Sequence, residues 1–556
     1  MTRPKLAAIA FLLASAAAPP ALAEDQSCSP VGVIQITSLG SPEDDLSRVA
    51  ELTGAVEWTP RLIRRGGAQA ETVCAPADFP WAPFARPERA PAGDFALRAL
   101  PVRLASTWNS TFPDGQNDGL LWAGRGFAGM FAIGADMHWG ALSAAIAPEG
   151  AWSENRSFQT RPTGLPGPLA FANPYYPNAI DLPQRFGAEP YLTWAPGQSY
   201  VRADLWNVGL GLSTESLWFG PGIRSSILMS NAGPGFPHAF VGTTRPGNIG
   251  IGKAELFLFW GQLSRTEYVA NGGRPLVEGL VVDYEPKWIP GLSLGLARVF
   301  VKPWKGEGIR DYLAMFQSFQ KKSLASQYPG GENPYDNQIA SVFGRWVFPE
   351  SGLEIYGEWA REDYDWTWWG TIREPDHSQA WLLGLQKAFR TSGGKVVRLH
   401  LEALHLQEVR PLAADGGTPV YYVHGNDLFY TNAGQLLGAW VGPGGDVQHL
   451  AVDVFHKGGR IGGYLERAGR NEAYYWAFIE PVQHNWSHDV EITAAVRQVL
   501  EVGPVEVSWE AAFSYRQNRD FLDHEKNVRL GLVLSVPLTR GGAAAPPAAG
   551  TSPPAP

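Results

Sequence analysis

The sequence predicts an all-β protein, a transmembrane antiparallel β-barrel of about 18 strands with long extracellular loops and a small N-terminal helical segment. Three observations predict this fold. Apolar and polar residues alternate over segments of roughly ten residues, the length that crosses a bilayer at a tilt. Short and long connections between these segments alternate along the chain. The chain also carries 22 Trp, 18 Tyr and 26 Phe beside 63 Gly, which is typical of aromatic girdles and glycine-rich strands.

The first residues have the three parts of a secretory signal peptide. Two basic residues precede an apolar run over residues 6–18, and Ala21-Leu22-Ala23 suits signal peptidase. We expect cleavage after Ala23. Cys28 is not preceded by the small, apolar residues of a lipoprotein signal, so no lipid anchor is expected.

The composition excludes several classes of protein. Loss of two basic residues with the signal leaves 43 basic and 54 acidic residues, a formal charge of −11, whereas a nucleic-acid partner requires a basic stripe.

Cys28 and Cys74 are the two cysteines. In an exported protein we expect them to form one disulfide, and they are too few for a metal site. No apolar stretch of roughly 18 residues follows the signal, which excludes a helical membrane protein.

The alternation is clearest in the C-terminal half. In residues 505–516, Val, Trp, Ala, Phe and Tyr on one face oppose Glu, Ser and Arg on the other. The same pattern recurs at 353–359, 398–403 and 528–538. One face of each strand therefore suits lipid and the other suits water. The strands of a soluble β-sandwich or propeller alternate in the same way. The lengths of the connections are therefore needed to distinguish these folds from a membrane barrel.

The lengths of the connections favour the membrane barrel. Short turns are expected at 289–291, 349–352, 391–394, 457–460 and 502–504. Long connections are expected at 261–278, 302–336, 362–378, 409–447, 468–488 and 517–526. This parity predicts strands near residues 253, 279, 292, 337, 353, 379, 396, 448, 461, 489, 505 and 527. The short turns then face the periplasm and the long loops face outward.

About six more strands are expected in residues 96–252, starting near Leu97. They include predicted strands at 121–136, 139–147, 186–195 and 199–208. The register between 209 and 252 is left open by the pattern.

The remaining segments complete a division into four parts. Ser41-Pro42-Glu43-Asp44 is typical of a capped helix start, and the helix is expected to run to Gly54. The loop at 302–336 is predicted to hold an amphipathic helix, because Ile309, Tyr312, Leu313, Phe316 and Phe319 follow helical spacing. The four parts are a signal peptide (1–23), an N-terminal periplasmic segment (24–95), an outer-membrane barrel (96–538) and a disordered Ala/Pro-rich tail (539–556).

Three motifs are distinctive in this sequence. They are Trp218-Phe219-Gly220-Pro221-Gly222 with Ser230-Asn231 and Phe236-Pro237-His238, Tyr430-Thr431-Asn432-Ala433-Gly434-Gln435 with Gly442-Pro443-Gly444-Gly445-Asp446, and Ser351-Gly352-Leu353-Glu354-Ile355-Tyr356-Gly357-Glu358. Together they resemble the capsule assembly family typified by Wzi. The resemblance extends over about residues 97–538. It implies an outer-membrane barrel with a helical periplasmic element, which acts as a lectin-like anchor for exported capsular polysaccharide and needs no cofactor. Surface polysaccharide and outer-membrane lipid are the implied partners, with the polysaccharide export machinery as a further candidate.

Two predicted outer loops carry candidate glycan-binding residues. Aromatic faces stack on pyranose rings, while amides and carboxylates bond to their hydroxyls. In loop 409–447 the candidates are Tyr422, His424, Tyr430, Asn432 and Asp446. The alternative is that this loop folds into the barrel as a plug. In loop 362–378 the candidates are Trp366 and Trp368, and the alternative is an aromatic girdle at the bilayer interface.

The segment from Trp218 to His238 is expected to be structural. Its glycine turns need special backbone angles, which suits an inward-folded loop with any glycan contact secondary. The residues assigned to this loop motif are Trp218, Gly220, Gly222, Arg224, Asn231 and His238.

Two other functions remain open. A porin or substrate channel would use the same polar lumen face, which carries Arg398, His400, Glu402, Arg497 and Arg529. A glycan hydrolase would use paired carboxylates such as Glu354, Glu358, Glu506 and Glu510. However, acids two or four apart on a strand line one face as ordinary lumen-facing groups do, and no nucleophile elbow, His-Glu-x-x-His pair or phosphate loop occurs in the sequence. We therefore predict a protein that is not an enzyme and that binds and attaches, or helps to assemble, surface polysaccharide.

Overall fold

The computed structural model describes residues 33–35, 39–65, 72–74, 95–270, 273–304, 312–316, 337–362, 368–373, 378–406, 420–425, 428–483 and 487–538. The predicted signal peptide and tail, Cys28 and most of the helix predicted around 309–319 lie outside these residues, as does the side chain of Cys74. The cleavage site and the disulfide therefore stay predictions.

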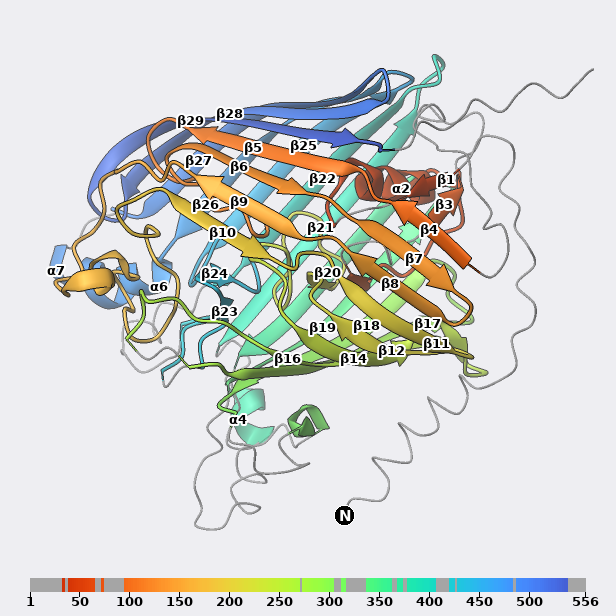
Figure 1. The fold of residues 1–556 in the computed structure, drawn as a ribbon, viewed down its shortest axis with the longest axis horizontal. Helices are drawn as coiled ribbons and strands as arrows, with labels where there is room; N and C mark the ends of the chain where they lie inside the picture. Colours follow the sequence, from red (N-terminus) through yellow and green to blue (C-terminus); the bar gives the residue numbers. More distant parts are fainter. Residues whose placement is uncertain are drawn as a thin grey trace, which may run out of the picture.

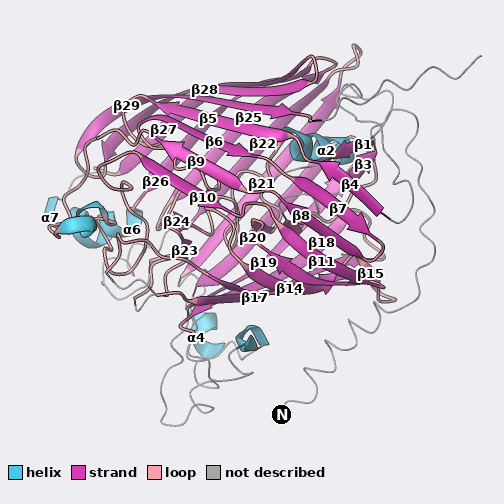
Figure 2. Ribbon diagram, viewed as in Figure 1, coloured by secondary structure: helices cyan, strands magenta, loops and turns pink. Residues whose placement is uncertain are grey.

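Strands dominate the described residues and form one closed antiparallel barrel (Figures 1 and 2). The barrel closes where β29 (Asp523–Val536) pairs with β5 (Val102–Asn109), with Val536 opposite Val102. The predicted antiparallel barrel is thus confirmed. Among the described helices, none has the length and apolar character needed to cross a bilayer.

Twelve strands begin close to the residues that alternation and loop parity predict. They are β16 (Gly252–Gln262), β17 (Leu276–Pro286), β18 (Leu292–Lys302), β19 (Asn337–Phe348), β20 (Leu353–Glu362), β21 (Gln379–Arg390), β22 (Val396–His405), β25 (Asp446–His456), β26 (Gly459–Arg470), β27 (Asp489–Val502), β28 (Val505–Arg519) and β29. Alternation fixes their register, because a shift of one residue would turn the apolar set toward the lumen.

The N-terminal half of the barrel is built from shorter strands, most of them in kinked pairs that share one path across the wall. The paths are β4 (Phe95–Ala99) with β5, β6 (Gly126–Ala132) with β7 (Ala135–Trp139), β8 (Leu142–Ile146) with β9 (Glu149–Ser153), β10 (Tyr191–Ala195) with β11 (Tyr200–Leu205), β12 (Val208–Ser213), and β14 (His238–Thr243) with β15 (Gly247–Asn248). Their pairings give six positions, so the described strands occupy 18 positions around the barrel.

The predicted strands at 186–195 and 199–208 are wrong as separate barrel strands. β10 pairs with β9 while β11 pairs with β8 and β12, so both lie on one kinked path. Gly197 forms the kink with a φ of +62°, and a Cβ there would meet the carbonyl oxygen of Ala147 at 2.2 Å. Likewise, the strands predicted at 121–136 and 139–147 lie at 126–139 and 142–153. A period-two pattern does not distinguish one kinked strand from two strands.

The predicted N-terminal helix is present as α2 (Pro42–Leu52). The backbone N–H of Asp44 donates to Ser41 Oγ at 3.2 Å, which caps the first turn. The apolar face of α2 packs on Ala388, Val396 and Phe455 of the barrel wall. These wall residues lie next to short turns, so α2 occupies the short-turn end, opposite α6 (Glu472–Tyr474) and α7 (Glu480–Gln483) (Figure 1). That the short turns face the periplasm stays a prediction.

Smaller elements lie outside the barrel sheet. The described two-stranded sheets pair β1 (Val33–Gln35) with β3 (Thr72–Cys74), β2 (Ile63–Arg65) with β13 (Leu217–Phe219), and β23 (Thr431–Asn432) with β24 (Gln435–Leu436). Short helices occupy Gly167–Phe171, Ala314–Phe316, Tyr475–Ile479 and α4 (Trp368–Arg373).

The two faces of the wall differ sharply in polarity. Outward-pointing apolar side chains are exposed, among them Leu294, Val342, Ile355, Leu383, Leu401, Leu450, Leu465, Ile492, Phe513 and Leu530. Lumen-facing neighbours are charged and buried, among them Arg345, Glu354, Arg398, Glu402, Asp453 and Glu466. This polarity is the reverse of that in a soluble sandwich or propeller and matches a barrel surrounded by lipid.

Candidate functional site

Three segments outside the barrel wall pack inside the lumen. They are residues 39–65, 214–237 and 420–445, without residues 426–427, and we call them together the plug. Their apolar residues share one buried core with strands β16–β22, in which Phe219, Ile227 and Tyr430 belong to the plug. The barrel lumen is therefore occupied by the chain itself.

Glu402 of β22 anchors the middle segment of the plug. Its carboxylate accepts the backbone N–H groups of Ile223 at 2.8 Å and Ser225 at 2.8 Å, and that of Arg224 at 3.1 Å. The Tyr356 hydroxyl donates to the same carboxylate at 2.7 Å. These donors compensate the burial of the charge.

Glycines make this anchoring geometry accessible. Gly220 has a φ of +90°, a conformation that side chains rarely adopt, and a Cβ on Gly222 would meet the carbonyl oxygen of Ser225 at 2.0 Å. The tight turn brings three successive N–H groups toward Glu402. Gly220 and Gly222 therefore shape the tight turn of this inward-folded segment.

The other residues of the loop motif also bond within the protein. Arg224 Nε lies 2.8 Å from Glu466 Oε2, and the Asn231 amide donates to the carbonyl of Leu39 at 3.3 Å. His238 Nδ1 lies 2.8 Å from the carbonyl oxygen of Phe236. Trp218 is buried, with the Arg64 guanidinium 4.8 Å from its ring centroid.

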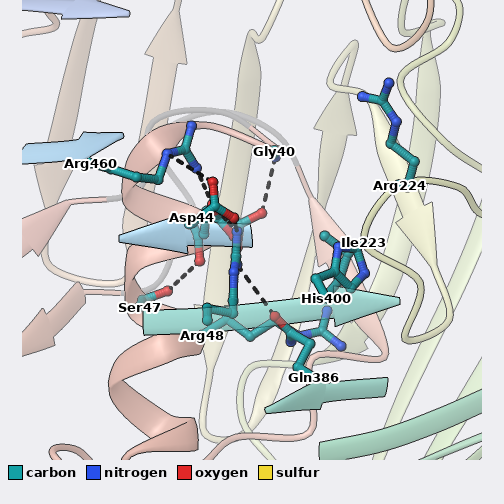
Figure 3. A network of polar contacts seen from close by, with 12 residues as sticks. Gly40, Asp44, Ser47, Arg48, Ile223, Arg224, Gln386, His400 and Arg460 are labelled. Atoms are coloured by element: carbon teal, nitrogen blue, oxygen red, sulfur yellow. Dashed lines mark hydrogen bonds and ion pairs between the residues drawn. The ribbon is translucent and has the colours of Figure 1, made fainter. Parts of the chain in front are cut away.

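Ion pairs join α2 to the wall. Arg48 pairs with Glu354, and its Nη2 donates to the carbonyl of Pro221 at 2.8 Å. Arg398 and Arg460 both pair with Asp45. Figure 3 shows Asp44 and Arg48 of α2 beside Arg460 of the wall. Burial acts to raise the pKa of Asp45, but the two wall guanidinium groups lower it to about 2.

Three predicted glycan-binding residues lie inside the plug. Tyr422 and Tyr430 are 0% exposed and Asn432 is 4% exposed. Tyr422 donates its hydroxyl to the carbonyl of Ile227 at 2.6 Å, and its ring stacks on Tyr430 at 5.6 Å between centroids. Asn432 Oδ1 accepts the N–H of Ser264 at 2.9 Å. Side chains buried this deeply cannot reach a polymer, so we correct the role of these three residues to a structural one in the plug.

The remaining glycan-binding candidates are placed less uniformly. Asp446 faces a cleft of about 430 Å³, which we call the rim cleft. His424 is half-buried, with Nδ1 3.2 Å from the carbonyl of Gly425. Trp366 lies outside the described residues, as does the side chain of Trp368. The rim cleft is lined by His405, Asp446, Arg467, Glu472, His488, Val490 and Gln517.

The structure contains an aromatic cluster at the long-loop end that the sequence did not predict. The Tyr474 ring lies 4.5 Å from Tyr175, 4.9 Å from Phe478 and 6.0 Å from Phe521, between centroids. Phe478 is 55% exposed. The rings come from three separate loops, so their proximity is invisible in the sequence. The one indication of this cluster in the sequence is the density of aromatic residues in the predicted loop 468–488. We call Tyr175, Tyr176, Tyr474, Phe478 and Phe521 the outer aromatic cluster.

Polar groups border this cluster. The Arg161 guanidinium lies 5.8 Å from the Tyr175 ring and 5.7 Å from the Tyr474 ring. His488 of the rim cleft lies 3.9 Å from the ring of Tyr475, the residue after Tyr474, and its Nδ1 is 2.9 Å from Glu472. An exposed ring and half-buried rings beside mixed polar groups have the chemistry that carbohydrate binding requires.

The described residues contain no group of three or more His, Cys, Asp or Glu side chains placed to hold a metal ion. Two of the four carboxylates considered for a hydrolase are held in ion pairs. Glu354 is buried and pairs with Arg48 and with Arg345 at 3.1 Å, and Glu510 pairs with Arg529 at 2.6 Å.

Comparison with known proteins gives a family match. The model of the family described as capsule assembly protein Wzi matches residues 134–520. A search of curated proteins found no match.

Among solved structures, the chain is similar to Wzi of Escherichia coli, described as an outer membrane protein involved in group 1 capsule assembly and as a carbohydrate-binding β-barrel. The TM-score is 0.52 with 14% identity, over 79% of this chain and 85% of that chain. Two proteins of Pseudomonas aeruginosa are also similar. For OccK3 (OpdO), the TM-score is 0.39 with 12% identity, over 80% of this chain and 96% of that chain. For OprD, the TM-score is 0.40 with 10% identity, over 80% of this chain and 96% of that chain. The first of these likenesses shows a shared barrel fold.

Proposed function

The chain belongs to the capsule assembly protein Wzi family, and from this premise we propose that it binds an exported surface polysaccharide at the outer membrane and helps to attach or assemble it. The E. coli relative is described as carbohydrate-binding, and we extend that property to this chain. The observation that carries the proposal is the outer aromatic cluster at the long-loop end, beside the polar rim cleft.

The outer aromatic cluster is better suited to binding a polymer than to binding a small ligand. Its rings are held by contacts with one another rather than enclosed, since Tyr474 packs against Tyr175 and Phe478 while Phe478 stays exposed. An open platform of this kind stacks on the apolar face of a sugar ring and leaves the chain free to continue in both directions. The side chains of the rim cleft then bond to hydroxyl or carboxylate groups of neighbouring sugar units.

The apolar outer face of the wall supports a place in a lipid bilayer. Outer-membrane lipid is therefore part of the proposal, with the long-loop end toward the cell surface. We also propose the polysaccharide export machinery as a partner. A lectin-like anchor needs to meet the polymer as it leaves the exporter.

The plug disfavours the porin alternative. Tyr422, Phe219 and Glu354 are buried where an open channel would be lined by water-exposed side chains. The hydrolase alternative loses Glu354 and Glu510 to ion pairs. A binding function is what the described geometry supports best.

Direct binding tests the proposal. Purified full-length protein in detergent is mixed with the surface polysaccharide isolated from the same cells, and binding is measured by biolayer interferometry. We expect binding by the natural protein and a loss of about tenfold or more in Tyr474→Ala and Phe478→Ala. The matched control is Trp288→Ala, an exposed aromatic residue next to a short turn. Equal binding by all variants would contradict the assignment of the cluster, and no binding by the natural protein would contradict the proposed function.

A further inference from the structure

A hollow of about 310 Å³ lies on the outer face of the wall, which we call the outer hollow. Its lining comes from β29, β5, β6, β9 and β10, which are successive neighbours in the sheet (Figure 1). Apolar side chains that point outward surround it, and they are Leu104, Phe127, Phe131, Trp152, Leu192, Leu532 and Leu534. Since the outer face of the wall suits lipid, the outer hollow faces the acyl chains of a bilayer.

Two glycines form the floor of the outer hollow. Alternation places Gly129 of β6 on the same outward side as Phe131, and Gly150 of β9 on the same outward side as Trp152. A Cβ on Gly150 would meet the ring of Phe131 at 2.8 Å and that of Trp194 at 2.7 Å. The large rings therefore lean over positions without a side chain, and the wall is hollowed where its other outward positions carry Leu, Val or Ile.

Arg125 lies on the same strand path as Gly129, at the long-loop end. Pairing continues past the ends of β6 and β9, because the N–H of Arg156 donates to the carbonyl oxygen of Arg125 at 2.9 Å. Arg125 is two residues from Phe127 and four from Gly129, so it shares their outward side and lies about 13 Å along the strand from the outer hollow. A head group at Arg125 would therefore leave its acyl chains running over Phe127 into the outer hollow.

The charge of Arg125 is not met by a carboxylate of the described residues. Its Nε donates to the carbonyl oxygen of Ser110 at 3.1 Å, and its Nη1 donates to that of Ser157. The neighbouring Arg156 differs, because it pairs with Glu154 at 2.9 Å. Two backbone carbonyls thus hold the half-buried guanidinium of Arg125 in place without neutralising it, which favours an anionic partner.

We propose that a phosphate-bearing lipid of the outer leaflet binds here, with its phosphate at Arg125 and one acyl chain in the outer hollow. The fork of N–H groups on arginine suits a phosphate, and the apolar lining suits a methylene chain. Lys526 of β29 is an exposed cation at the same end, on the other side of β5, and adds to the attraction. The inference rests on the proposed place of the chain in the outer membrane and adds a defined lipid site to it.

Native mass spectrometry of the purified full-length protein in detergent tests the proposal, with phosphatidic acid as the probe and diacylglycerol with the same acyl chains as the neutral comparison. We expect the first phosphatidic acid to bind at least about tenfold more tightly than diacylglycerol. Arg125→Gln is expected to weaken this binding about tenfold by removing the charge. Gly129→Leu is expected to weaken it about tenfold by filling the outer hollow.

Each variant has a matched control. Arg390→Gln removes an exposed arginine at the short-turn end of β21. Gly344→Leu adds the same side chain at an outward position of β19, away from the outer hollow, where a Cβ would meet a methyl group of Leu294 at 3.2 Å. Both controls are expected to bind phosphatidic acid as the natural protein does.

Heat-modifiable migration on gels first establishes that each variant is folded. Equal binding of phosphatidic acid and diacylglycerol would overturn the proposal, and so would binding that is unchanged in Arg125→Gln or in Gly129→Leu. Full displacement of the lipid by inorganic phosphate would also overturn it, because the site would then be one for a free anion. Tyr474→Ala is expected to leave lipid binding unchanged, so failure of this site and failure of the proposed polysaccharide surface are distinguishable.

Discussion

Arg48 of α2 and Glu354 of β20 form an ion pair between residues 306 positions apart in the chain, and both side chains are almost completely buried. The pair fixes the plug to the wall at the short-turn end. Arg345 joins it by bonding Glu354 at 3.1 Å and Glu51 of α2 at 2.8 Å. The position of α2 is thus set by ion pairs that its own charged residues form with Arg345 of β19 and Glu354 of β20.

Removing one partner of this pair is expected to destabilise the barrel. Arg48→Ala leaves Glu354 buried with Arg345 as its remaining cation, a change that typically costs about 3–5 kcal/mol. The midpoint of thermal unfolding in detergent measures it. Arg156→Ala, which breaks an exposed pair, is the control and should change the midpoint little. Equal midpoints for Arg48→Ala and the natural protein would show that the pair contributes nothing.

The contact between Asp45 and the wall is expected to depend on pH. Because its pKa falls to about 2 in the folded protein, its contribution is present above the unfolded value of about 4 and is lost as the pH falls toward 2. The full contribution is about 2 kcal/mol. Unfolding measured from pH 7 to pH 2 should show this decline, and Asp45→Asn should make the decline smaller by about the contribution of Asp45. A decline of the same size in Asp45→Asn would assign the pH dependence to other groups.

Gly222→Ala is expected to disrupt the inward-folded loop. The new Cβ would meet the carbonyl oxygen of Ser225 at 2.0 Å, and the N–H groups would lose their alignment with Glu402. We expect a loss of several kcal/mol or failure to fold, as for other strained glycine replacements. Gly393→Ala, where the nearest atom lies 4.0 Å away, is the control on heat-modifiable gels. Normal folding of Gly222→Ala would contradict the account of the turn.

The plug predicts low ionic conductance. Purified protein in planar bilayers should show small, rare currents, since the lumen is filled by the chain. Arg398→Ala removes bonds to both Asp45 and Asp453 and should raise the frequency of openings by loosening α2. Large steady currents through the natural protein would favour the channel alternative.

The wall was predictable from the sequence because its signals are local. Alternation and loop parity placed the twelve C-terminal strands, and Ser41 with Pro42 marked the start of α2. The kink at Gly197 was misread because a break in alternation has the same pattern as a turn. Strand pairing, which joins β11 to β8, is not encoded in a period-two pattern.

The site was less predictable because it depends on distant contacts. Tyr422 looked like an exposed loop residue, but its N–H donates to Glu362, 60 residues away, at 2.8 Å, and this bond lies inside the barrel. The outer aromatic cluster brings together Tyr175, Tyr474 and Phe521 from three loops. Composition identified the loops rich in aromatic residues, whereas the direction in which each loop folds is set by side chains far along the chain.

Retention of surface polysaccharide by living cells tests the central claim most directly. A strain that lacks the protein is complemented with the natural chain, Phe478→Ala or Trp288→Ala, at equal amounts of folded protein, and cell-bound and released polymer are measured. The account predicts that deletion and Phe478→Ala shift polymer from the cell-bound to the released fraction with total synthesis unchanged, while Trp288→Ala restores attachment. Unchanged attachment in the deletion strain would contradict it.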